Sequence, residues 1–116
     1  RGSVIIVLAT DVPLESRQLK RIARRAGAGL ARLGSFYGNG SGDIGFAFST
    51  AHKIPHYPEG DLIVRDYMHE GKIDLLFQAA AEVTQEAVLN AMIASPAMYG
   101  KGTSFRPSLK NWLDQN

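Results

Sequence analysis

The sequence contains no cysteine, a single tryptophan and no long apolar run. The absence of cysteine excludes disulfide bonds and leaves the redox environment of the protein open. No apolar stretch reaches the roughly 20 residues that a transmembrane helix needs, and the opening run VIIVLA is too short for the core of a signal peptide. Charge of one sign is also scarce, because 13 basic and 11 acidic residues give a net charge of +2. We therefore expect neither a membrane nor a nucleic acid as a partner.

Hydrophobic periodicity predicts an α/β chain of one domain, residues 1–116, with helices and strands alternating along the sequence. The β-branched run 4–9 is typical of a strand buried on both faces. Apolar residues spaced three and four apart predict helices over 15–33 and 73–95, and the basic residues of the first helix fall mainly off its apolar stripe. Residues 43–50 predict a second strand, and residues 62–68 indicate a third. The tail after Pro96 has no clear period.

The expected sheet is small, and this has a consequence for the fold. Two or three strands make a poor independent sheet. Each helix carries one apolar stripe, so we expect each to cover one face of the sheet. In the second strand Ile44, Phe46 and Phe48 share one face, which we expect to point to the core. The small residues on the opposite face indicate close contact with another layer. The chain is therefore expected to complete its fold with something outside its own sequence.

Three side chains near the strand starts are candidates for chemistry: Ser3, Ser41 and Asp43. Ser3 precedes the first strand, and the other two lie where a glycine-rich stretch, GSFYGNGSGDIG, enters the second. If these strands pair, a nucleophile, a second hydroxyl and an acid come into line. A turn capped by Ser41 and Asp43 explains the same residues, since serine and aspartate are common in turns. Both interpretations stay open on the residues alone.

Two other kinds of site fit the sequence less well. The glycine-rich stretch lacks the lysine of a phosphate-binding loop and does not match the dinucleotide fingerprint. The three histidines, His52, His56 and His69, are not spaced as zinc ligands, and we interpret them as loop histidines. We expect no metal and no organic cofactor.

Four segments in this order resemble the smaller, C-terminal subunit of the DmpA-type aminopeptidases, the group of L-aminopeptidase/D-esterases and β-peptidyl aminopeptidases. The segments are GSVIIVLATDVPL, QLKRIARRAGAGLAR, SGDIGFAFSTA and EAVLNAMIA. Together they reach from Gly2 to about residue 92. Each segment alone is a weak signal, whereas their combination is specific.

This resemblance implies a precursor that cuts itself between Gly2 and Ser3, so that Ser3 becomes the nucleophile at a new chain end. It also implies that Ser41 lies within hydrogen-bonding reach of Ser3 and that Asp43 is the acid of the site. Other members carry glutamate at that position. A larger α subunit from the same precursor is implied to complete a four-layer α-β-β-α sandwich and to supply an oxyanion-hole asparagine. This β subunit alone is then inactive, and αβ units are expected to form oligomers.

The implied activity is release of N-terminal residues from short peptides, amides or esters through an acyl-enzyme. Two alternatives remain: an acyltransferase of the ornithine acetyltransferase type, which uses threonine where this chain has Ser3, and a non-enzymatic binding domain with a degenerate site. Three explanations of the pair Arg1-Gly2 stay open: a precursor remnant, a cloning scar, or a subunit boundary defined differently. The compartment stays open between cytoplasm and periplasm, because a targeting signal would precede the larger subunit.

Overall fold

A computed structural model describes residues 2–116 and shows an α/β arrangement built on two parallel strands. Strand β1 spans Ile5–Thr10 and strand β2 spans Ile44–Ser49. Their register places Ile5 opposite Ile44 and Thr10 opposite Ser49. Parallel strands need a crossover connection, and here the connection contains helix α1, Ser16–Arg32. Both strands and the first helix lie within one residue of the bounds that periodicity predicted.

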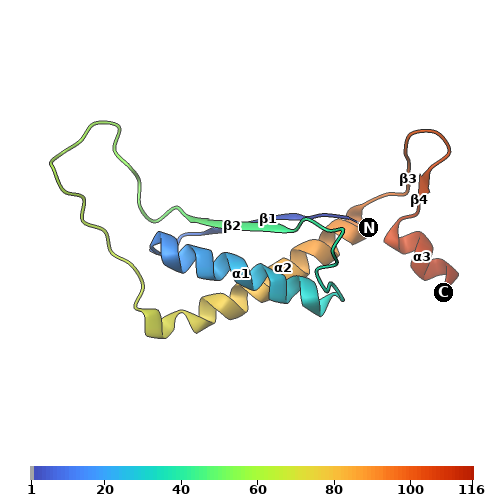
Figure 1. Cartoon of the computed structure of the whole chain (residues 1–116), viewed down its shortest axis with the longest axis horizontal. Helices are drawn as coiled ribbons and strands as arrows, with labels where there is room; N and C mark the ends of the chain where they lie inside the picture. Colours follow the sequence, from blue (N-terminus) through green and yellow to red (C-terminus); the bar gives the residue numbers. More distant parts are fainter. Residues whose placement is uncertain (1) are drawn as a thin grey trace.

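Both long helices lie on the same side of the two strands (Figure 1). Helix α2, Asp74–Ala94, follows a short 3-10 helix η1, Glu70–Lys72, and packs mainly on α1. The expectation that each helix covers its own face of the sheet was therefore wrong for this chain. The core lies between the helices and the sheet, around the buried side chains of Leu14, Ile22 and Ala80.

The opposite face of the sheet is uncovered. Ile5, Val7, Phe46 and Phe48 are all about half exposed or more. The expectation that β1 is buried on both faces is wrong within this chain, and so is the expectation that Ile44 points to its core, because Ile44 is 59% exposed. The strands carry apolar side chains on both faces, but residues 2–116 supply a covering layer for only one.

The small residues expected at a close contact do lie at one. A Cβ built on Gly45 of β2 would lie 3.2 Å from the carbonyl oxygen of Ala23, in α1. A Cβ on Gly29 of α1 would lie 2.5 Å from the carbonyl oxygen of Ala81, in α2. Gly29 is therefore where the backbones of the two helices approach each other. Gly27 has a different neighbour, the hydroxyl of Tyr37.

A long arm, residues 51–69, separates β2 from η1 and extends away from the helices (Figure 1). The third strand expected at 62–68 does not form, since these residues have no strand partner within residues 2–116. Leu62 is 88% and Val64 is 91% exposed. The composition of an apolar run predicts a strand, but a strand needs a neighbour to bond with, and the described part of the chain offers none here.

The base of the arm is tied to α1 through Glu70. Its carboxylate accepts two hydrogen bonds from the Arg17 guanidinium, at 3.0 and 2.9 Å, and is paired with Arg21 as well. The buried Gln18 amide donates both to Glu70 and to the carbonyl of Met68, at 3.0 and 2.7 Å. The bonds from Arg17 and Gln18 lower the pKa of Glu70 to about 2.

The C-terminal segment contains structure that the sequence did not predict. A short hairpin pairs β3, Met98–Tyr99, with β4, Phe105–Arg106, and leads to helix α3, Leu109–Gln115. Ser108 caps α3 by accepting a hydrogen bond from the backbone amide of Asn111. Strands of two residues are too short to show a hydrophobic period. The sequence therefore did not predict them.

Candidate functional site

The register of the sheet brings the start of the chain to the glycine-rich turn. The Ile44 amide donates to the carbonyl of Val4 at 2.9 Å, directly before the first paired residues. Two residues before the Ile5–Ile44 pair, Ser3 therefore lies beside Gly42. The turn that presents Gly42 is closed by a bond from the Ser41 amide to the carbonyl of Gly38.

Two neighbouring groups of this turn hold the two sides of the Gly2–Ser3 peptide bond. The Ser41 hydroxyl lies 2.7 Å from the carbonyl oxygen of Gly2. The Gly42 amide donates to the Ser3 hydroxyl oxygen at 2.9 Å. The Gly2 carbonyl, which is attacked when this bond is cut, is thus bonded to Ser41. The Ser3 hydroxyl next to it is bonded to the following residue, Gly42.

Asp43 stands behind Ser41, as expected. Its carboxylate oxygen Oδ1 lies 2.8 Å from the Ser41 hydroxyl, and both side chains are half-buried. The implied hydrogen bond between Ser41 and Ser3 is absent among residues 2–116, because the hydroxyl of Ser41 faces the Gly2 carbonyl instead. The three candidate side chains are brought together, but through the turn backbone and the Gly2 carbonyl.

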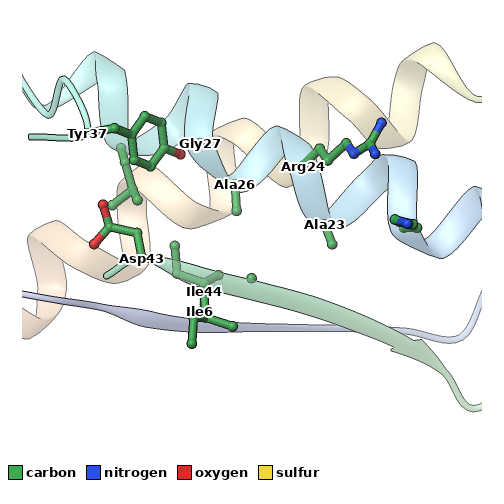
Figure 2. A pocket seen from close by; sticks show the side chains of 11 residues that line it. Ile6, Ala23, Arg24, Ala26, Gly27, Tyr37, Asp43 and Ile44 are labelled. Carbon is green, nitrogen blue, oxygen red and sulfur yellow. The ribbon is translucent and has the colours of Figure 1, made fainter. Parts of the chain in front are cut away.

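A cavity of about 370 Å³ borders the acid, between α1 and the start of β2. Figure 2 shows Asp43 at the same end of this cavity as the Tyr37 ring, while Arg24 lies at the other end. On the α1 side the cavity is lined in part by small residues, including Ala26 and Gly27. Asp43 can therefore reach both the Ser41 hydroxyl and this cavity.

Sequence reasoning missed two features of the site. The first is the Gly42 amide, since a backbone donor leaves no signature in the side-chain pattern. The second is Tyr37, which has a φ of +53°, a left-handed conformation uncommon for a residue other than glycine. The glycines around Tyr37 predicted tight turns, but they did not predict that a tyrosine would adopt the left-handed conformation.

The three histidines lie in the arm, away from Ser3, and have local neighbours. His52 Nε2 lies 2.7 Å from the carbonyl of Asp66, and His69 Nδ1 accepts from the Gly71 amide. The His56 ring meets Tyr57 edge-on. The expectations about the Arg1-Gly2 pair involve Arg1, which lies outside the described residues.

Comparison with known proteins assigns this chain to a family. Residues 1–105 match Peptidase family S58. The chain is 44% identical over 99 residues to the beta-peptidyl aminopeptidase BapA of Sphingosinicella microcystinivorans, an alignment that covers 85% of this chain and 25% of that protein. The chain therefore spans about a quarter of the length of this relative.

Solved structures give the same result. The PH0078 protein from Pyrococcus horikoshii OT3 matches with a TM-score of 0.86 and 44% identity, over 95% of this chain and 31% of that one. The L-aminopeptidase D-Ala-esterase/amidase from Ochrobactrum anthropi, described as a prototype of the serine aminopeptidases and a variant of the Ntn hydrolase fold, matches with a TM-score of 0.81 and 39% identity, over 95% and 33%. The resemblance to the DmpA-type aminopeptidases is thereby confirmed, and the chain belongs to peptidase family S58.

Proposed function

We propose that this chain is the β subunit of a self-cleaved serine aminopeptidase and that Ser3 is its nucleophile. The observation that carries the proposal is a pair of hydrogen bonds to the Gly2–Ser3 peptide. The Ser41 hydroxyl lies 2.7 Å from the Gly2 carbonyl oxygen, and the Gly42 amide lies 2.9 Å from the Ser3 hydroxyl oxygen. Family membership and the aminopeptidase relatives support the same interpretation.

In this proposal self-cleavage proceeds as an acyl shift. The Ser3 oxygen attacks the Gly2 carbonyl carbon, the new C–O bond forms, and the C–N bond between the two residues breaks. The hydroxyl proton ends on the Ser3 nitrogen, which becomes an amine. Water then hydrolyses the ester, which frees the carboxylate of Gly2 and restores the Ser3 hydroxyl. Residue 2 is exposed, and a Cβ there would meet nothing within 4 Å, so the chain around this bond is uncrowded.

Turnover repeats the attack on a substrate. The Ser3 hydroxyl attacks the scissile carbonyl of a short peptide, amide or ester, and the leaving amine or alcohol takes the proton. Water releases the acyl group as the free N-terminal residue. The α-amine of Ser3, ordinarily with a pKa near 8, is partly neutral at pH 7 and lies next to the hydroxyl that it would assist. Ser41 polarises the carbonyl, and Asp43 positions Ser41.

A larger α subunit from the same precursor completes this site. Two observations support this subunit. The chain covers only 25–33% of the lengths of its relatives, and one apolar face of its sheet is uncovered. In this proposal the α subunit adds a second sheet and an outer helix layer to give the four-layer α-β-β-α sandwich around the single domain 1–116. It also supplies the oxyanion donors and the group that binds the substrate amine, and the αβ units assemble into oligomers.

The test is turnover by the protein that contains both parts. L-Alanine p-nitroanilide and a β-amino acid p-nitroanilide are supplied with and without glutamate as an acyl acceptor. Release of p-nitroaniline that is independent of glutamate supports the aminopeptidase. Release that depends on glutamate, with transfer of the acyl group to it, would instead indicate an acyltransferase. No release from either anilide, by a protein that is assembled and cut, would favour a binding domain.

A further inference from the structure

We infer that the backbone amide of Gly42 is a positioning group for the Ser3 hydroxyl. This inference rests on the proposed function and adds a group to its site. The Gly42 amide donates to the Ser3 oxygen at 2.9 Å, and the contact joins residues 39 positions apart in the sequence. The sheet register sets this contact, because it continues the pairing of Ile5 with Ile44 by two residues.

The Gly42 amide is available for this bond because the sheet does not use it. The ladder begins two residues later, where the Ile44 amide donates to Val4. An amide with no ladder partner at the end of a strand must find water or a side chain. Here the side chain is the proposed nucleophile, and the adjacent residue, Ser41, holds the carbonyl next to it.

The chemistry of a hydroxyl explains what this bond can do. A serine oxygen has two lone pairs and one proton. Accepting from Gly42 occupies one lone pair and fixes the side-chain rotamer, while the other lone pair stays free for attack and the proton stays free to leave. A preset amide dipole also stabilises the negative charge that develops on the oxygen as its proton departs. The bond therefore aligns Ser3 in self-cleavage and in turnover alike.

Gly42 is suited to a matched experiment because its side chain is not needed. Its φ is not among the positive values, and a Cβ at this position would lie 3.7 Å from the Ser3 oxygen, an ordinary contact. Replacement of Gly42 by glycolic acid, its hydroxy acid, puts an ester oxygen in place of the N–H, and that oxygen cannot donate a hydrogen bond. The same replacement at Gly40 is the control, since its amide donates no hydrogen bond within residues 2–116.

The experiment introduces glycolic acid by nonsense suppression into the protein that contains both subunits and measures kcat and KM on L-alanine p-nitroanilide. We expect the substitution at Gly42 to lower kcat about tenfold, as befits one hydrogen bond, to slow self-cleavage similarly, and to leave KM unchanged. Glycolic acid at Gly40 should behave as wild type. A melting temperature equal to that of the Gly40 control would show that the loss is not one of stability.

Two results would overturn the inference: kcat at the wild-type level with glycolic acid at Gly42, or an equal loss with glycolic acid at Gly40. Ser3→Ala separates this failure from failure of the proposed function. If Ser3→Ala removes activity but the Gly42 substitution does not change kcat, the nucleophile stands and the amide has no role. If Ser3→Ala turns over the anilide at the wild-type rate, the proposed function fails and the inference fails with it.

Discussion

Ser41 has one hydroxyl proton and two acceptors in reach, the Gly2 carbonyl at 2.7 Å and the Asp43 carboxylate at 2.8 Å. It can donate to only one of them at a time. When it donates to Asp43, the Gly2 carbonyl loses its donor, and when it donates to Gly2, the carboxylate faces a bare oxygen. Which of the two acceptors takes the Ser41 proton therefore decides whether Ser41 can polarise a carbonyl at this position.

Asp43→Asn tests this dependence at the residue scale. The asparagine amide can donate to the Ser41 oxygen and leave the Ser41 proton for the carbonyl, so we expect folding and self-cleavage to survive. Turnover should fall roughly 10- to 100-fold, because the neutral amide holds Ser41 less firmly than a carboxylate does, and a hydrogen bond to a charged group contributes about 1.5–3 kcal/mol. Asp61→Asn, the same change on the exposed arm, should leave kcat unaltered. Wild-type kcat in Asp43→Asn would mean that Asp43 only caps the turn.

The identity of the candidate residues was accessible from the sequence, but their contacts were not. Ser3, Ser41 and Asp43 could be selected because they flank two predicted strands. Which of them touch depends on strand register, and register is set by long-range pairing that a local pattern does not encode. The expected bond between Ser41 and Ser3 was accordingly replaced by bonds through Gly2 and Gly42.

At the scale of elements, helix α1 lies between β2 and α2 and contacts both. It meets the sheet at Gly45 and meets α2 at Gly29. Glycine costs a helix up to about 1 kcal/mol relative to alanine, and the close approach of α2 explains why it is tolerated at Gly29. Helix bounds were predicted within one residue because the apolar stripe is long, whereas strand 62–68 was predicted wrongly because its partner cannot be seen in a local window.

Gly29→Ala should destabilise the packing of α1 on α2. The added Cβ would lie 2.5 Å from the Ala81 carbonyl oxygen and 2.7 Å from the Thr84 Cβ, and backbone atoms cannot move aside cheaply. We expect a loss of about 1–3 kcal/mol in the free energy of unfolding. Gly27→Ala is the control, because its Cβ meets only the end of the Tyr37 side chain, which can rotate away. Equal stability of the two variants in chemical denaturation of the assembled protein would contradict this packing.

The link between the arm and α1 should depend on pH through Glu70. Hydrogen bonds from Arg17 and Gln18 lower its pKa from the ordinary 4.5 to about 2. A carboxyl whose pKa is depressed on folding stabilises the fold above its unfolded value and loses that contribution as pH falls through its folded value. Stability from Glu70 should therefore decline between about pH 4.5 and 2, and salt should weaken it because the carboxylate is partly exposed.

Melting temperatures of wild type and Glu70→Gln, recorded from pH 6 to pH 2, check this expectation. The difference between them should be largest near pH 6 and shrink toward pH 2. Glu86→Gln alters an exposed carboxylate on α2 and serves as the control. A difference that stays constant over this range would show that Glu70 acts through packing and not through its charge.

At the scale of the whole molecule, the chain is more extended than a compact domain of its size. Its radius of gyration is 18.8 Å, where about 13 Å is typical for a compact domain near this size. Its accessible surface is 9243 Å², where about 6,200 Å² is expected for a folded monomer of this mass. The excess lies partly on the bare sheet face, the arm and the C-terminal hairpin, all of which expose apolar side chains.

Residues 1–116 produced alone should consequently fail to fold cooperatively. We expect a weak near-UV circular dichroism signal, a broad thermal transition and a tendency to associate through the exposed apolar surface. Production together with the larger subunit should restore a sharp transition. A monomeric chain with a cooperative melt and a native-like near-UV spectrum would refute the claim that a partner completes the fold.

The central claim is that Ser3 is both the residue at which the precursor cuts itself and the nucleophile of turnover. The most direct measurement is the intact mass of the smaller fragment from the full precursor, recorded with anilide turnover for wild type and Ser3→Ala. The account predicts a wild-type fragment that begins at Ser3, and a Ser3→Ala protein that stays in one piece and releases no p-nitroaniline. A Ser3→Ala protein that is still cut before residue 3, or that still turns over the anilide, would contradict it.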